Sequence, residues 1–289
     1  MLDINILMLA ALWVLSASKV TVQSFFGKKN IRTAPDSIAF NGLVFGFISL
    51  LFGAFLFKGC AWPTVIFGAL FGIGSVCFQF VYTRALSTGP VSLTVMLGNL
   101  AMVVPTFFSV IVYHDACGPL KIVGLLLTII ALVLNVKKHG DQKAEKGWLF
   151  YVAIAFLMNA LVAVDMKIFS TTYHNGENFP FVAVAYITAA LVSAVIFLFM
   201  RRGEAKLSFS AKGPVWLYTF FVALFLGSFQ ALNSYASGRI NGVFYYPALN
   251  GGSTMLLTLS GVLLFKEKLS ARSWASIAVG VAAIILLSL

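Results

Sequence analysis

The sequence predicts an all-α polytopic membrane protein, with ten transmembrane helices arranged as two inverted five-helix repeats around a central cavity. Three observations predict this fold: the composition, the number of long apolar segments and a similarity between the two halves. Of the 289 residues, 60% are hydrophobic and only 10% are charged, whereas a soluble domain carries about 25% charged residues. A soluble particle of 31.3 kDa cannot bury that much apolar surface, so the composition excludes ordinary soluble domains.

Ten segments are long and apolar enough to cross a bilayer, which takes about 20 helical residues. We expect helices over residues 4–24, 36–57, 64–86, 90–112, 118–136, 147–170, 178–200, 213–235, 242–265 and 270–289. Several prolines lie within a few residues of a segment's start, where a missing N–H removes no helical hydrogen bond. Ser270 is the expected N-cap of the last helix.

The basic residues predict how the helices are oriented. Fifteen of the 20 lysines and arginines lie at the connections that follow odd-numbered segments, against four at the even-numbered ones. Lysine and arginine concentrate in cytoplasmic loops, so we expect both termini outside, in a multi-pass protein of a bacterial inner (plasma) membrane. The net charge of +11 is dispersed over many short loops, which indicates a topology signal rather than a nucleic-acid-binding surface.

The two halves of the chain resemble each other. GNLAMVVPTFFSVIVYHDACG (98–118) matches NGGSTMLLTLSGVLLFKEKLS (250–270), and FVYTRALSTGPV (80–91) matches LNSYASGRINGV (232–243). Each longer segment begins with small and amide residues, continues apolar and ends on an acidic residue, Asp115 or Glu267. We therefore expect repeats over residues 1–138 and 147–289, joined by a basic linker at 139–146. Two copies of an odd number of spans must cross the membrane in opposite directions, as in many secondary transporters.

The same segments carry a family resemblance. YTRALSTGPVSLTVMLGNLAMVVP (82–105), followed by an acidic residue, and YASGRINGVFYYPALN (235–250), leading to LLFKEKLS, resemble the EamA-like branch of the drug/metabolite transporter superfamily. The resemblance covers essentially the whole chain as two five-helix halves. It implies a ten-helix basket with a central substrate cavity, and substrates that range from amino acids and nucleotide precursors to toxic amphiphiles.

On these grounds we expect a secondary active transporter of small organic metabolites or drug-like solutes, working by alternating access with proton coupling or exchange. Two alternatives remain: a lipid or lipid-linked-sugar flippase of the same fold, and a non-transporting receptor or assembly subunit. No HExxH, GxSxG or P-loop spacing occurs, so we expect no enzymatic activity, cofactor or metal. The expected partners are a small-molecule substrate, membrane lipid and protons, without nucleic acid, for a monomer or weak homodimer.

The candidate substrate-binding residues are polar or aromatic residues inside the predicted spans. A polar side chain inside a span is costly in lipid and therefore faces the protein interior. Gln79 and Gln230 each share a helical face with a residue three positions later. The structural alternatives are hydrogen bonds between helices and, for Lys19, a side chain that extends to the headgroups. The set is Trp13, Lys19, Gln79, Tyr82, Asn99, Asn159, Gln230, Asn233, Tyr246 and Asn250.

Asp165 is the candidate coupling residue, because it is an acidic residue well inside a predicted span and can take up a proton. The alternative is a structural pair with Lys167 or Arg239. Glu267 and Asp115 are expected to have structural roles where the matched segments end. Pro105 and Pro247 are expected to bend the fourth and ninth spans.

Overall fold

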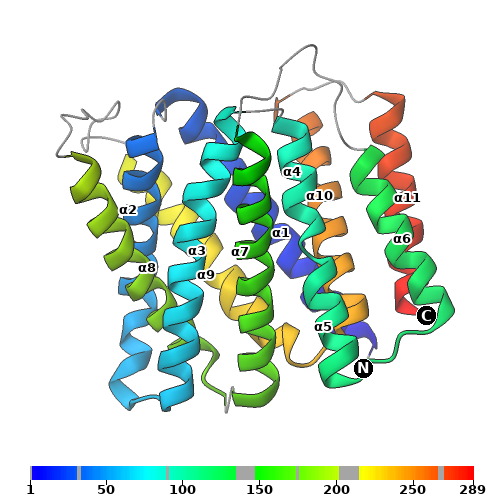
Figure 1. Ribbon diagram of the computed structural model, residues 1–289, viewed down its shortest axis with the longest axis horizontal. Coiled ribbons are helices and arrows are strands. Elements are labelled where there is room, and N and C mark those ends of the chain that lie inside the picture. Colours follow the sequence, from blue (N-terminus) through cyan, green and yellow to red (C-terminus); the bar gives the residue numbers. More distant parts are fainter. Residues whose placement is uncertain are drawn as a thin grey trace.

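The computed structural model in Figure 1 describes residues 2–30, 34–88, 91–134, 147–173, 176–201, 215–265 and 270–289. Over these ranges the chain is helical, with short connections and no strand. The elements are α1 (Leu2–Asn30), α2 (Ala34–Gly53), the 3₁₀ helix η1 (Ala54–Lys58), α3 (Trp62–Thr88), α4 (Val91–Leu100), α5 (Val103–Tyr113), α6 (Pro119–Leu134), α7 (Trp148–Ile168), the π-helix η2 (Phe169–Tyr173), α8 (Asn178–Arg201), α9 (Val215–Ser237), α10 (Gly242–Phe265) and α11 (Ala271–Ser288).

The helices have the length and apolar character that a bilayer requires. Eight helical segments of the described chain are long and apolar enough to cross a membrane. The two other predicted segments form α6, a shorter apolar helix of 16 residues, and α10, which has 24 residues. Large apolar side chains also face outward, among them Leu50 and Ile111, which are 79% and 70% exposed. The chain therefore has the architecture of an integral multi-pass membrane protein.

The fourth predicted span is two helices rather than one. Pro105 lacks an N–H and its ring opposes a helical carbonyl at Ala101. Around it, the N–H groups of Ala101, Met102 and Val104 bond to carbonyls three residues back, at 3.2–3.3 Å, instead of four. This break separates α4 from α5 in the span that Pro105 is expected to bend. Pro247 lies inside α10, which continues through it.

A pair of small residues positions α3 against α8, and the predicted N-cap begins α11. Gly68 and Gly72 of α3 lie against α8, where a Cβ on Gly68 would stand 2.9 Å from the Cβ of Val184 and one on Gly72 would overlap the Ala185 carbonyl oxygen. This GxxxG spacing thus serves close packing within the chain. Ser270 caps α11, accepting a hydrogen bond from the Ser273 N–H at 3.2 Å.

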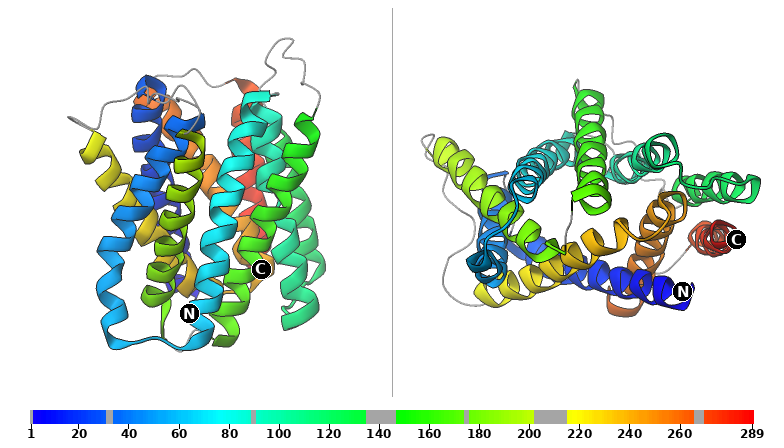
Figure 2. Two further views of the ribbon diagram at one scale, coloured as in Figure 1. Left: turned by 60° about the vertical axis from the view of Figure 1, so that its left-hand side comes forward. Right: turned by 90° about the horizontal axis from the view of Figure 1, so that it is seen from below.

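The most extensive helix contacts join the first half of the chain to the second. Helix α2 packs against α8, α6 against α11, α3 against α7 and α8, and α1 against α9 and α10. Figure 2 shows the α6–α11 pair and the α2–α8 pair at opposite ends of the bundle, with the other helices between them. The two termini lie toward the same end of the bundle (Figure 1).

Two apolar cores fill this arrangement. One joins α1, α2, α3, α7, α8 and α9 around fully buried side chains such as Phe40 and Phe181. The other joins α1, α6, α9 and α10 to Met102, the residue before α5, around Leu12 and Tyr245. A cavity lies where the two cores meet.

Candidate functional site

A cavity of about 190 Å³ lies between α3, α5, α7, α9 and α10. It takes Phe71 and Met166 from the first core and Met102, Tyr246 and Leu249 from the second, so it marks the junction of the two. The described residues that line it are Phe71, Ala101, Met102, Pro105, Asn159, Val162, Ala163, Met166, Phe229, Gln230, Asn233, Tyr246, Leu249 and Asn250.

The polar groups of the cavity wall all come from the second half of the chain, while both halves contribute apolar side chains. The first half contributes apolar side chains, from Phe71, Ala101, Met102 and Pro105. Every carboxamide and the tyrosine come from the second half, on α7, α9 and α10. None of the described lining residues carries a charge at neutral pH. The cavity is therefore lined by uncharged polar groups on three helices of the second half, together with apolar side chains from both halves.

Five of the ten predicted binding residues line the cavity: Asn159, Gln230, Asn233, Tyr246 and Asn250. On α9, the Asn233 amide donates to Gln230 Oε1 at 3.0 Å, and the Tyr245 hydroxyl donates to Asn233 Oδ1. The shared helical face predicted for Gln230 and Asn233 is confirmed. These bonds fix the orientation of two carboxamides without using all of their hydrogen-bonding groups.

Asn159 and Asn250 are the least committed polar groups of the wall. The Asn159 amide donates to the Gly98 carbonyl at 3.0 Å, which links α7 to the end of α4. The Asn250 amide donates to the Tyr246 carbonyl at 3.0 Å within α10. Their Oδ1 atoms accept no hydrogen bond from the part of the chain that the structure describes.

Tyr82 and Trp13 lie behind this wall rather than in it. The Tyr82 ring stacks on Phe78, with centroids 5.1 Å apart, and covers Gly98, the residue whose carbonyl Asn159 binds. Trp13 Nε1 donates to the Ala248 carbonyl at 3.0 Å, next to cavity residue Leu249. Both aromatic residues therefore position the backbone that carries the cavity wall.

The contact between Trp13 and α10 depends on a glycine, and this gives a testable prediction. A Cβ on Gly252 would overlap the Trp13 indole, whereas one on Gly251 would lie at an ordinary 3.6 Å from Thr128. We expect Gly252→Ala to displace Trp13 and to lower thermal stability by about 1–3 kcal/mol, the usual cost of overpacking. Gly251→Ala is the matched control, and melting curves of the two purified variants make the comparison. An equal effect of both substitutions would contradict this role of Gly252.

The other three predicted binding residues are not among the described residues that line the cavity. Lys19 is half-buried on α1, one heptad from both Leu12 and Phe26, which are fully buried. Asn99 is half-buried at the break between α4 and α5, and its carbonyl accepts from the Met102 N–H at 3.2 Å. Gln79 lines a different recess.

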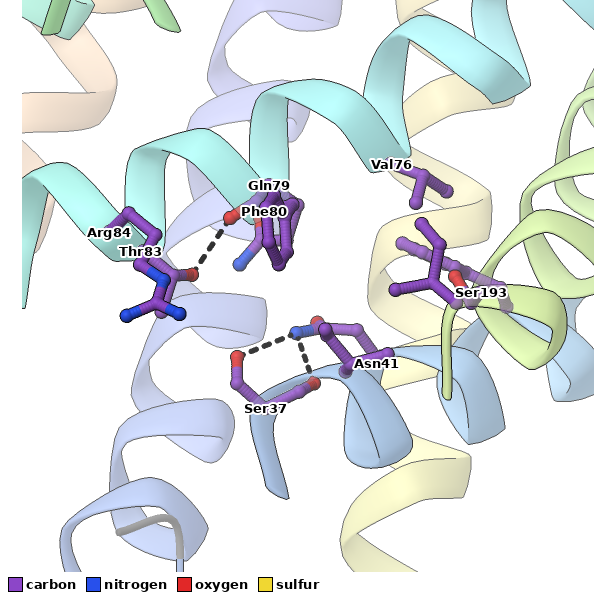
Figure 3. A pocket seen from close by; sticks show the side chains of 11 residues that line it. Ser37, Asn41, Val76, Gln79, Phe80, Thr83, Arg84 and Ser193 are labelled. Carbon is purple, nitrogen blue, oxygen red and sulfur yellow. Dashed lines mark hydrogen bonds between the residues drawn. The ribbon is translucent and has the colours of Figure 1, made fainter. Parts of the chain in front are cut away.

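That second recess lies between α2, α3 and α8 (Figure 3) and has a volume of about 20 Å³. Gln79, Thr83 and Arg84 approach it from α3, opposite Ser37 and Asn41 of α2. The Asn41 amide donates to the Ser37 carbonyl at 2.8 Å. This volume holds about one water molecule, so the 190 Å³ cavity is the stronger candidate site.

The alternative considered for Asp165, a structural pair with Lys167 or Arg239, does not form among the described residues. Lys167, only 3% exposed, lies 3.7 Å from Asp115 Oδ2 and donates to the Ser237 carbonyl at 2.8 Å. Arg239 lies over the ring of Tyr235, 4.3 Å from its centroid. That alternative was wrong because the connection after α5 places Asp115, rather than Asp165, beside Lys167.

Asp115 has the structural role expected of it, by two contacts. Besides its ion pair with Lys167, its Oδ2 accepts a hydrogen bond of 2.7 Å from the Gly242 N–H at the start of α10. A carboxylate at the N-terminus of α10 is also stabilised by the positive end of the helix dipole. Glu267, its predicted counterpart in the second half, and the 139–146 linker lie outside the described residues.

Asp165 itself stays unpaired. Its Oδ2 atom is buried and has no hydrogen-bond partner among the described residues. It lies three residues after Val162 of α7 and four before Phe169 of η2, and those two side chains pack against Gly74 and Phe67 of α3. It does not line the cavity, although its neighbour Met166 does.

Several cavity residues carried no signal in the sequence. Phe71 and Phe229 are two of 28 phenylalanines, most of which face lipid or packing partners. Only the adjacency of Phe229 to Gln230 distinguishes either of them. Among the described residues, no group of three His, Cys, Asp or Glu side chains is placed to hold a metal ion.

Comparisons with known proteins agree with this fold without assigning an activity. No family model matches the chain. A curated relative, described as an uncharacterized protein of Haemophilus influenzae, is 28% identical over 192 residues. The match covers 64% of this chain and 62% of the relative, so the chain spans less than two thirds of that protein's length.

A solved structure described as "Crystal structure of protein" is similar over almost the entire chain. Its TM-score is 0.68 at 18% sequence identity, with 98% of this chain and 96% of that chain covered. At this level of identity the likeness is one of fold. The helical bundle described above is thus an architecture that occurs in a known structure.

Proposed function

We propose that the protein is a secondary active transporter that moves small organic solutes across the membrane by alternating access to its central cavity. The observation that carries the proposal is the 190 Å³ cavity inside a bundle of membrane-spanning helices, with a wall of uncharged polar groups. Burying four carboxamides away from lipid and leaving part of their hydrogen-bonding capacity unused has a cost. A solute that binds there would satisfy that capacity.

The helix contacts support an inverted repeat. The predicted repeats, taken in order, pair α1, α2, α3, α4–α5 and α6 with α7, α8, α9, α10 and α11. Exchanging the two sets leaves the α2–α8 and α6–α11 contacts unchanged, and converts α3–α7 into α9–α1 and α3–α8 into α9–α2. It also converts α1–α10 into the contacts of α7 with α4 and α5. All of these contacts occur, which is the pattern expected when two halves are related by a twofold axis.

Such a repeat provides a physical route to alternating access. Two halves of the same fold in opposite orientations can exchange conformations, which moves the opening of the cavity from one side of the membrane to the other. The charge distribution supports external termini and cytoplasmic basic connections. We propose a bacterial inner membrane as the location, with the EamA-like resemblance as further support.

The cavity volume favours a small solute over a drug-sized one. Pockets for drug-sized ligands measure about 300–1,000 Å³, and this cavity measures about 190 Å³. We therefore propose small metabolites as the transported class, driven by a gradient of protons or by exchange.

The test is uptake from a mixed metabolite extract into proteoliposomes, with the trapped solutes identified by mass spectrometry. Ala163→Trp is designed to fill the cavity, because Ala163 lines it. Leu161→Trp is the matched control on the same helix, since Leu161 is 57% exposed on the outer surface. We expect at least one solute to accumulate with the wild type and with Leu161→Trp, but not with Ala163→Trp. Accumulation that is the same in all three, or no greater than in protein-free liposomes, would reject the proposal.

A further inference from the structure

The unused hydrogen-bonding groups of the cavity define what it can bind. Asn159 and Asn250 each keep a free Oδ1 acceptor among the described residues, and each amide nitrogen has one hydrogen left after its 3.0 Å bond to a backbone carbonyl. A carboxamide side chain thus offers an acceptor and a donor next to each other. The groups that complement it are likewise a donor next to an acceptor, as in another carboxamide or a lactam.

The electrostatics of the cavity disfavour ions. The described lining residues include four carboxamides and a tyrosine but no Asp, Glu, Lys or Arg. The neighbouring Lys167 is paired with Asp115 and bonded to the Ser237 carbonyl, so it does not offer an unpaired charge. The neighbouring carboxyl of Asp165 is not part of the cavity lining. A charged solute would lose its hydration without gaining a counter-ion, which is far more costly than desolvating an amide.

The size and the apolar lining of the cavity determine what the remainder of the solute can be. A cavity of about 150 Å³ with an apolar lining admits a benzene molecule, so the 190 Å³ here accommodates one ring with a small substituent. Apolar side chains such as Phe71, Met102 and Phe229 line the same cavity as the carboxamides. A flat ring can contact these apolar side chains while its substituent bonds to the carboxamides.

We infer that the cavity selects uncharged single-ring solutes that carry a carboxamide-like edge, and that it discriminates against charged analogues of the same shape. This inference rests on the proposed transport function, since it names the solute class of the same cavity. The carboxamides on α7, α9 and α10 recognise the amide edge, and the apolar lining side chains from both halves of the chain contact the ring.

Three probes of nearly the same shape test this selectivity: nicotinamide, which is neutral, nicotinate, which is an anion at neutral pH, and 1-methylnicotinamide, which is a cation. Their equilibrium binding to the purified full-length protein is measured by dialysis in detergent. We expect nicotinamide to bind at least about tenfold more tightly than either ion, a difference of about 1.4 kcal/mol. Equal binding of the three probes, tighter binding of an ion, or no saturable binding of nicotinamide at millimolar concentration would overturn the inference.

Two variants and a control connect the binding to the cavity. Asn250→Leu removes a carboxamide whose recorded amide bond stays within its own helix, so the fold should tolerate it, and nicotinamide binding should fall about tenfold or more. Ala163→Trp should abolish binding by occupying the space, whereas Leu161→Trp, on the exposed face, should bind as the wild type does. Unchanged nicotinamide affinity in a folded Asn250→Leu variant would contradict the assignment.

The outcomes for transport and for selectivity are separable. Selective nicotinamide binding without solute accumulation in proteoliposomes would leave the inference standing and reject the transport proposal. Cavity-dependent accumulation of ionic solutes, without selective nicotinamide binding, would support transport and reject the inference.

Discussion

Replacing Lys167 with methionine should lower the free energy of unfolding by about 3 kcal/mol, at the low end of the cost of breaking a buried ion pair. Lys167 is 3% exposed and Asp115 is 20% exposed, so partial hydration of the carboxylate moderates the loss. The substitution leaves Asp115 without its counter-ion and the Ser237 carbonyl without the donor at 2.8 Å. Because these contacts join α7 to the connection after α5 and to the end of α9, we expect the melting temperature in detergent to fall clearly.

Two further variants make this prediction specific. Lys121→Met is the control, because the Lys121 ammonium lies at the surface, 3.4 Å from the Ala116 carbonyl, and its loss should change stability little. Adding Asp115→Asn to Lys167→Met should recover part of the loss, since the double variant no longer holds an unpaired buried charge. A Lys167→Met protein as stable as Lys121→Met would show that the pair contributes nothing.

Replacing Asp165 with asparagine should abolish proton-driven uptake while leaving the exchange of solute across the membrane intact. Asp165 Oδ2 is buried without a hydrogen-bond partner among the described residues, and an asparagine of nearly the same size cannot take up and release a proton. The measurement compares uptake of a solute found in the proteoliposome assay, with and without an imposed pH gradient. Counterflow of the same solute without a gradient is the internal control.

The outcome decides between two uses of the same carboxyl group. Loss of gradient-driven uptake with normal counterflow would identify Asp165 as the proton-coupling residue. Gradient-driven uptake that persists in Asp165→Asn would reject proton coupling at this position. Since Asp165 lies outside the cavity wall, its effect on coupling would have to pass through α7, by way of neighbours such as Met166.

Much of the fold is predictable from the sequence because a bilayer imposes one length and one polarity on every crossing. The predicted segments 64–86 and 242–265 correspond to α3 (Trp62–Thr88) and α10 (Gly242–Phe265). Pro105 indicates a disturbance in the fourth span, since the chemistry of proline acts locally. The end of α1 could not be predicted in this way, because the helix continues beyond its apolar segment to Asn30.

The candidate site is predictable in kind more than in detail. Asn159 and Asn250 could be identified because a carboxamide inside a span has to face the interior. That rule does not say which interior, and so Gln79 and Asn99, which obey it equally, lie away from the cavity. Likewise, counting the predicted membrane spans gives the end of the bundle at which Lys167 lies. It does not give Asp115 as the partner of Lys167, because that contact is set by the path of the chain between α5 and α6.

The most direct measurement is the two-sided accessibility of a cysteine placed at Ala163, in the cavity wall. The native Cys60, Cys77 and Cys117 are first replaced by alanine, because Cys117 is exposed and the other two are partly so. If two inverted halves expose the cavity alternately, a membrane-impermeant maleimide will modify Ala163→Cys when added to either side of the bilayer. Leu161→Cys, on the exposed face of α7, is the control, because its modification should not depend on which way the cavity opens. Modification from one side only, or from neither, would contradict alternating access.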